Sequence, residues 1–306
     1  MRYSKLGGQA VIEGVMMKHE KEYSVAVRKP DGGIEVTKKA TSSIRDKYKI
    51  ASLPIIRGMV IFAESLSTGM KTLNYSASFF EEEEKEAKEK NEKKESLVMG
   101  LVMLLAIVLA VGIFVIVPFL ISEALKRPVP SPQLRGLIEG VIRVALFVAY
   151  VKLISCMEDI KRVFMYHGAE HKTIFCYEHG LPLTVENVRK QSRFHPRCGT
   201  SFMFVMIILS ILLSSALVLI FPGLQNVNRA VWILVKLLVL PLVMGIGYEF
   251  IKYAGKHDNL LVKILSAPGL WMQRITTQEP TDDIIEVGIA SLKAVITDNP
   301  EDDEIK

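Results

Sequence analysis

The residues best suited to chemistry lie in one stretch, YHGAEHKTIFCYEHG, at 166–180. It contains His167-Gly-Ala-Glu170-His171, in which the two histidines are four positions apart. On a helix, positions four apart share a face, so both imidazoles can reach one ion while Glu170 sits beside it. This is the inverted zinc-peptidase order, in which the glutamate is the general base that activates water at the metal. The motif is short, and chance alone also produces it.

Further potential ligands follow the motif. The segment HPRCGTS brings His195 and Cys198, and neutral imidazole and thiolate are the ligands that zinc prefers. A carboxylate from a neighbouring helix is a common third ligand, and Glu249 in GIGYEFIKYAG fits that role. We therefore expect a zinc site with His167 and His171 as ligands, Glu249 or His195 completing the set, and Cys198 nearby.

The same residues also have a purely structural interpretation. Histidines and glutamates at a membrane surface often bond to headgroups, loop carbonyls and each other, and Cys198 can be a small buried residue. Four arginines in the same stretch offer partners to the glutamates, namely Arg162, Arg189, Arg193 and Arg197. A closed set of His167, His171, His195 and Cys198 would be structural too, because catalysis needs an open coordination position.

Long apolar runs dominate the rest of the chain. Half of its 306 residues are hydrophobic, and residues 97–121 and 201–221 are uncharged. A helix needs about 20 apolar residues to cross the hydrocarbon layer. Residues 134–157 and 230–248 carry a few charges but are otherwise long and apolar enough. The sequence therefore predicts a mainly α protein, a polytopic membrane bundle of four transmembrane helices.

Lysine and arginine are unevenly distributed around these four runs. With the N-terminus inside, sixteen of them flank the inner side, against Lys126, Arg127 and Arg229 on the outer side. Cytoplasmic flanks carry the excess, which predicts that both termini and residues 158–200 are cytoplasmic. The basic residues lie beside apolar runs and do not interleave with aromatics, so membrane lipid is the expected partner and nucleic acid is not.

The N-terminal part divides into two predicted regions. Residues 1–50 form a cytoplasmic β-rich segment, a small meander whose β-branched runs lie around 10–17, 23–28 and 34–38. Residues 51–96 contain an interfacial helix at 53–73, interrupted by charges, and a connector of alternating Glu and Lys at 81–95.

The remainder divides into two more. Residues 97–275 form the four-helix membrane domain, which includes the cytoplasmic His/Glu/Cys loop at 158–200 and a cytoplasmic amphipathic segment at 259–275 that Pro268-Gly269 interrupts. Residues 276–306 form a cytoplasmic amphipathic helix, with Asp282 in its first turn, and an acidic tail.

Several motifs together carry a resemblance to a known family. They are GGQAVIEGVMM, YHGAEHKTIFCYEHG, HPRCGTSF, GYEFIKYAG and PGLWMQRITTQEP. With them the chain resembles the YqhQ-like family of bacterial membrane proteins, which carry domain of unknown function 1385. The resemblance covers nearly the whole chain and implies a multi-pass protein of the bacterial cytoplasmic membrane. It implies no activity.

Three functions are compatible with these patterns. The first is a membrane-embedded zinc-dependent hydrolase, peptidase-like, with Glu170 as the base and a peptide or membrane protein as substrate. The second is a non-catalytic scaffold or assembly factor in which the cluster is structural. The third is a transporter with Glu139 and Arg143, four apart, along a polar path, although no repeated halves support it. The oligomeric state has no signature in the sequence.

Overall fold

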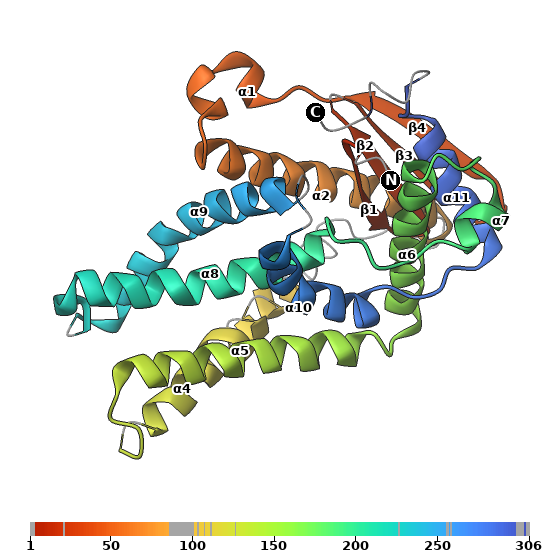
Figure 1. Ribbon diagram of the computed structural model, residues 1–306. Coiled ribbons are helices and arrows are strands. Elements are labelled where there is room, and N and C mark those ends of the chain that lie inside the picture. Colours follow the sequence, from red (N-terminus) through yellow and green to blue (C-terminus); the bar gives the residue numbers. More distant parts are fainter. Residues whose placement is uncertain are drawn as a thin grey trace. The chain divides into compact units, whose positions relative to one another are not determined.

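The computed structural model describes residues 4–20, 22–85, 101–102, 104–106, 108–110, 112–125, 127–225, 227–254, 257, 259–297 and 303. The described chain is mainly helical, with a four-stranded antiparallel sheet at its N-terminal end (Figure 1). It forms two compact units, one made of Met1–Phe80, Ile154–Met206 and Leu240–Lys306, the other of Glu81–Leu153 and Ile207–Val239. All residues of the candidate site belong to the first unit.

The predicted β meander is confirmed, with four strands in the order β1-β2-β3-β4. They are β1 (Leu6–Val11), β2 (Gly14–His19), β3 (Glu22–Arg28) and β4 (Ile34–Ala40). Each strand pairs antiparallel with the next along the chain. Strands β1 and β4 are therefore the two edges of the sheet.

The prediction of one β run around 10–17 is wrong, because the chain reverses inside it. Val11 pairs with Gly14, and the two residues between them form the turn, with Glu13 at φ 49°. A Cβ atom at Gly14 would overlap the carbonyl oxygen of Ala26, so the close approach of β2 to β3 requires glycine here. Apolar residues flank the turn on both sides, and Glu13-Gly14 is the only turn signal between them.

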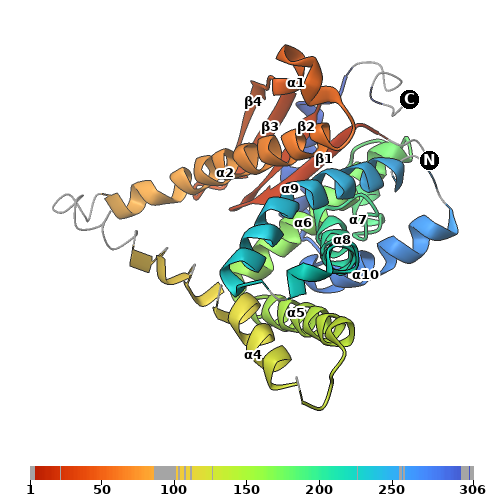
Figure 2. The same ribbon diagram turned by 90° about the vertical axis from the view of Figure 1, so that its left-hand side faces the viewer.

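Helices cover both faces of the sheet (Figures 1 and 2). On one face lies α2 (Ile56–Lys85), whose Leu73 and Phe79 pack on the second hydrophobic cluster of the sheet. On the other face lie α6 (Glu158–Glu178) and α11 (Asp282–Lys293). The larger core forms there from Leu6, Val15, Met17, Ala26, Tyr166, Ala169, Ile174, Ile284, Val287, Leu292 and Val295. The predicted interfacial helix at 53–73 is thus the first part of a longer helix that packs on the sheet.

The predicted segment at 158–200 begins with helix α6, as the i, i+4 spacing of its two histidines indicated, and continues with the short α7 (Val185–Arg189). Glu158 and Asp159 lie in the first turn of α6, where carboxylates interact favourably with the helix dipole. The polar residues of α6 masked its apolar stripe, since the sheet buries Tyr166 and Ile174 while His and Glu occupy the neighbouring positions.

Two C-terminal helices complete the first unit. Helix α10 (Leu260–Thr276) begins at Asn259, whose side chain accepts a hydrogen bond from Val262 N. The predicted interruption at Pro268-Gly269 is wrong, because α10 runs through Pro268; the proline removes one backbone donor and the rest of the helix continues. Helix α11 confirms the amphipathic helix predicted after residue 280, with Asp282 in its first turn.

The remaining elements are short helices and turns together with the long apolar helices. The short ones are α1 (Ile44–Lys47), the 3₁₀ turns η1 (Lys49–Ser52) and η3 (Pro222–Gln225), the π-helical η2 (Gly112–Ile116) and α4 (Val117–Ala124). The long ones are α5 (Pro132–Ile154), α8 (Gly199–Ile220) and α9 (Arg229–Ala254). Within the described residues, one helix segment, Leu237–Ala254, is long and apolar enough to cross a membrane. Glu139 and Arg143, which lie four positions apart, form an ion pair on α5.

Two predictions reach beyond the described residues. Most of the charged connector at 81–95 lies outside them, and so do parts of the first predicted span at 97–121.

Candidate metal centre

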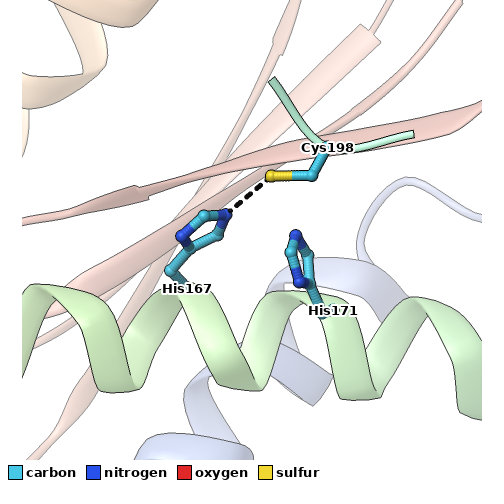
Figure 3. A group of neighbouring side chains, drawn as sticks. All are labelled: His167, His171 and Cys198. Carbon is cyan, nitrogen blue, oxygen red and sulfur yellow. Dashed lines mark hydrogen bonds between the residues drawn. The ribbon is translucent and has the colours of Figure 1, made fainter. Parts of the chain in front are cut away.

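Three potential metal ligands from two parts of the chain meet beside α6. The ligand atoms of His167, His171 and Cys198 all lie within 4.8 Å of one another. Figure 3 shows the two imidazoles projecting from neighbouring turns of α6 toward the thiol, which enters from the segment that precedes α8. We call these three residues the donor group. The helical spacing in His-x-x-Glu-His therefore does place both histidines on one face, as the sequence predicts.

Backbone carbonyls orient both imidazoles of the donor group. The Nδ1 atom of His167 lies 2.8 Å from the carbonyl oxygen of Thr276, and that of His171 lies 2.6 Å from the carbonyl oxygen of Arg193. A carbonyl only accepts, so each Nδ1 donates the hydrogen bond, and in the neutral ring each Nε2 presents a lone pair. The Nε2 atom of His167 is 3.2 Å from Cys198 Sγ. Histidines that bind metals are held in this way by an outer partner.

Burial keeps the centre in a form suited to a cation. His171 is 1% exposed, and this burial lowers its pKa, so the ring is neutral and free to coordinate. Burial raises the pKa of Glu170 to about 8; the neighbouring His167 opposes that rise and Cys198 adds to it. A bound cation would reverse the effect on Glu170, because it stabilises the carboxylate.

The side chain of Glu170 projects from α6 toward strand β1. A Cβ atom at Gly8 would come within 2.7 Å of Glu170 Cγ and 2.8 Å of its Oε1. The side chain is 5% exposed, and no residue in the described part of the chain donates a hydrogen bond to its carboxyl group. An unpartnered carboxyl beside three metal-type ligands is a candidate for proton transfer.

His195 is close to the donor group but its ring has other partners. Its Nδ1 accepts a hydrogen bond from Arg197 N at 3.3 Å, and its Nε2 faces Glu178 Oε2 at 3.7 Å. Gln273 holds its backbone with two hydrogen bonds, one from His195 N at 2.7 Å and one to His195 O at 2.8 Å. In this arrangement Gln273 holds the backbone of the segment that carries Cys198, and the ring of His195 does not join the three ligand atoms.

Glu178 anchors a second polar cluster that the sequence did not single out. It accepts hydrogen bonds from Ser4 N at 2.9 Å and Ser4 Oγ at 2.7 Å, and it pairs with Arg197. Burial by itself raises the pKa of Glu178, but His195, Arg197 and Ser4 together lower it to about 2. We call Ser4, Glu178, His195 and Arg197 the Glu178 cluster. Only the general expectation that local arginines would pair with glutamates pointed to it.

Glu249, the other predicted ligand, lies outside the donor group. Its carboxylate forms a two-pronged ion pair with Arg57, with Nε at 2.6 Å, and accepts a hydrogen bond from Ile55 N at 3.3 Å. Ile55 has φ 69°, a strained value for a β-branched residue, and it packs directly on Gly245. Nothing in the residue pattern indicated that the start of α2 would reach α9 and take this carboxylate.

The donor group has the composition of an open metal site. Two imidazoles and one thiolate suit zinc, and three protein ligands leave the fourth tetrahedral position for water or substrate. Structural zinc sites normally use four protein ligands. The arrangement therefore defines a class of protein: a helix-covered antiparallel sheet that carries three potential metal ligands with an adjacent carboxyl group.

Comparisons with known proteins give the family. Residues 53–298 match the family described as "Protein of unknown function (DUF1385)". The "Uncharacterized protein YqhQ" of Bacillus subtilis (strain 168) is 36% identical over 301 residues, covering 95% of this chain and 92% of the relative. No solved structure matches the chain. The protein belongs to the DUF1385 family, which confirms the resemblance seen in the sequence.

Proposed function

We propose that this protein is a zinc-dependent hydrolase of the bacterial cytoplasmic membrane, peptidase-like, with its centre on the cytoplasmic side. The convergence of His167 Nε2, His171 and Cys198 Sγ within 4.8 Å carries the proposal. The outer hydrogen bonds to the carbonyls of Thr276 and Arg193 support it, since they leave both Nε2 lone pairs for a metal.

The chemistry assigned to the centre is hydrolysis of an amide bond. His167, His171 and Cys198 would hold zinc, which would supply Lewis acidity. Glu170 takes a proton from the attacking water, whose oxygen forms a bond to the carbonyl carbon. When the carbon–nitrogen bond breaks, Glu170 returns the proton to the leaving nitrogen, so that a carboxylic acid and an amine result.

Exposed apolar side chains support the membrane location. Leu153, Leu219 and Leu238 are each about two-thirds exposed or more, on helices α5, α8 and α9. Soluble proteins rarely expose apolar side chains on this scale, whereas lipid accommodates them. The sixteen-to-three bias of lysine and arginine supports an orientation with both termini and the metal centre in the cytoplasm.

A structural metal in a membrane scaffold is the second candidate. The observation that favours it is that the outer partners of the two imidazoles come from different segments, the end of α10 and the segment after α7. A metal at the donor group would therefore clamp these segments onto α6 and add directly to folding stability. In that case Glu170 would have no chemical role.

One set of measurements separates the two candidates. Wild-type protein purified without chelator is analysed for metal, then incubated with β-casein, a naturally unfolded protein, and the products are identified by mass spectrometry. We expect near-stoichiometric zinc and cleavage of casein by wild type and by His179→Ala, whose imidazole contacts Gln191 outside the donor group. Glu170→Gln should keep the zinc and lose cleavage. Zinc without cleavage in both wild type and variant supports the scaffold, and metal-free wild type contradicts both candidates.

A further inference from the structure

Strand β1 lies lengthwise along α6, antiparallel to it. Three contacts fix this alignment along the length of the helix: Ser4 with Glu178, Gly8 with Glu170, and Glu13 with Arg162. Because the histidines of the donor group occupy the middle of α6, the middle of β1 runs beside the candidate metal centre.

The outer edge of β1 is open along Leu6–Val11, whereas Lys5, just before the strand, donates its N–H to Asp303 O at 2.7 Å. Strand β1 is the first strand of the sheet and pairs on one side only, with β2. No residue that the structure describes forms a hydrogen bond with the backbone of Leu6–Val11 from the other side. Gly7 and Gly8 are both exposed, although they lie within a strand. Every second residue of such an edge presents an unused N–H and C=O pair.

Helix α6 lies over this edge of the sheet, and α11 lies over its middle. Among the strands, α6 contacts β1 most and β2 next, whereas α11 packs on β2 and β3. The donor group is on the side of α6 that faces the segment with Arg193 and Cys198. The unpartnered carboxyl of Glu170 meets β1 at Gly8, where glycine leaves room for it.

We propose that an extended peptide binds to the outer edge of β1, along Leu6–Ala10, as a fifth strand of the sheet. Neighbouring strands lie about 4.8 Å apart, so the backbone of the added strand would pass next to Gly8 and Glu170. An amide group of that strand would then lie within reach of Glu170 and the donor group. Backbone hydrogen bonds would supply affinity with little dependence on the side chains of the peptide.

The inference rests on the proposed hydrolase and adds its substrate class: polypeptide in an extended conformation. It also accounts for the GGQAVIEG motif, which the metal centre alone leaves unexplained. A Cβ atom at Gly7 would have no neighbour within 4 Å, and the atoms nearest to one at Gly8 belong to Glu170, so the two glycines keep this part of the strand free of side chains. Folded domains, whose backbone amides are already paired, would be excluded.

The test uses zinc-loaded full-length protein and three kinds of hydroxamate probe, since a hydroxamate chelates zinc whatever is attached to it. Acetohydroxamate reports the metal alone. Acetyl-tetraalanine hydroxamate adds a short strand, and four further versions each carry one N-methylated amide. We expect the tetraalanine probe to bind about tenfold more tightly than acetohydroxamate or better, from two or three backbone hydrogen bonds. Methylation of alternate amides should abolish that gain, and methylation of the others should not.

A photoreactive version of the peptide probe gives the position. With benzoylphenylalanine at its N-terminus, cross-links mapped by mass spectrometry should fall on residues 6–11. His171→Ala, which removes a ligand, should abolish binding of all probes. A tetraalanine probe that binds no better than acetohydroxamate, shows no alternation, or cross-links elsewhere overturns the inference and leaves the metal centre standing. Failure of acetohydroxamate itself, together with absence of zinc, overturns the proposed function and the inference with it.

Discussion

Helix α6 carries two polar clusters that use histidine in opposite ways. In the donor group, the Nδ1 atoms of His167 and His171 bond to carbonyls and their other nitrogens turn toward Cys198. In the Glu178 cluster, His195 turns its Nε2 toward a carboxylate that Arg197 already neutralises. The donor group brings potential metal-binding atoms close together, whereas in the Glu178 cluster the charge of the carboxylate is neutralised by a guanidinium of the same protein.

The difference shows how a candidate metal centre can be distinguished from an internal ion pair by the partners of its side chains. Both clusters are buried, so both must compensate the cost of removing polar groups from water. The Glu178 cluster does so with its own guanidinium. The three ligand atoms of the donor group lie close together, and a cation bound among them would compensate the desolvation of all three.

The largest expected difference between the two clusters is the loss of zinc affinity when a ligand of the donor group is removed. In His171→Ala the donor group loses one of three ligands, and we expect zinc affinity to fall by more than the roughly 10–100-fold that loss of an outer partner costs. Competition with a chromogenic chelator measures this affinity. His195→Gln is the matched control in the other cluster and should retain zinc. Equal loss in both variants would contradict the division into two clusters.

Removing the carboxyl group should separate binding from chemistry. Glu170→Gln keeps the size of the side chain and loses the ability to accept a proton, so hydrolysis of casein should fall about 10²–10⁴-fold. Zinc content, measured by mass spectrometry on the same preparation, should be unchanged. Full activity in this variant would assign the proton transfer to another group.

Acid should act selectively on the Glu178 cluster. The pKa of Glu178 is lowered to about 2 in the folded protein, so its contribution to stability is complete above its ordinary pKa of 4.5 and is lost as pH falls from there toward 2. The contribution is on the order of 3 kcal/mol. Thermal unfolding of Glu178→Gln should therefore occur at lower temperature at neutral pH and depend less on acid.

Glu186→Gln provides the control for that measurement. Glu186 pairs with Lys190 on the surface, where an ion pair contributes little. Its unfolding should follow the wild-type curve. If Glu178→Gln and wild type lost stability in parallel between pH 4.5 and 2, the assignment of the lowered pKa would be wrong.

The smallest effect is expected at the first strand. In Gly8→Ala the added methyl group meets Glu170 Cγ and Oε1, and the shifted carboxyl should lower hydrolysis roughly 10–100-fold while zinc stays bound. Gly7→Ala is the matched control, since no atom lies within 4 Å of its Cβ position. Comparison of the two rates at saturating zinc tests whether Gly8 positions Glu170. Equal rates would show that it does not.

Helical spacing was enough to predict two of the three residues of the donor group. His167 and His171 follow from the i, i+4 rule, and Cys198 followed from ligand chemistry because it arrives in the next polar segment. Glu249 and His195 were plausible by the same chemistry, yet each has a partner from a segment distant in sequence, Arg57 and Glu178 respectively. Such pairings depend on tertiary packing, which a motif does not contain.

The fold was predictable where polar turns separate the elements and less so elsewhere. The later strands and helix α11 were found because Gly, Pro and Asp mark their ends. The hairpin of β1 and β2 was missed because Glu13-Gly14 is the only turn signal between two apolar runs. The packing of α6 on the sheet was missed because its buried stripe is interleaved with histidines and glutamates. Four spans were predicted, and one is long and apolar enough among the described helices.

Gly168 restricts one of the two variable positions of the His-x-x-Glu-His motif to glycine. A Cβ atom at Gly168 would overlap the carbonyl oxygen of Gln278, whose N–H donates to Phe164 O at 2.8 Å. The chain leaving α10 therefore crosses α6 at the first variable position of His-x-x-Glu-His. In this architecture the recognisable signature has four fixed letters, His-Gly-x-Glu-His, and a search for comparable centres gains selectivity by requiring the extra one.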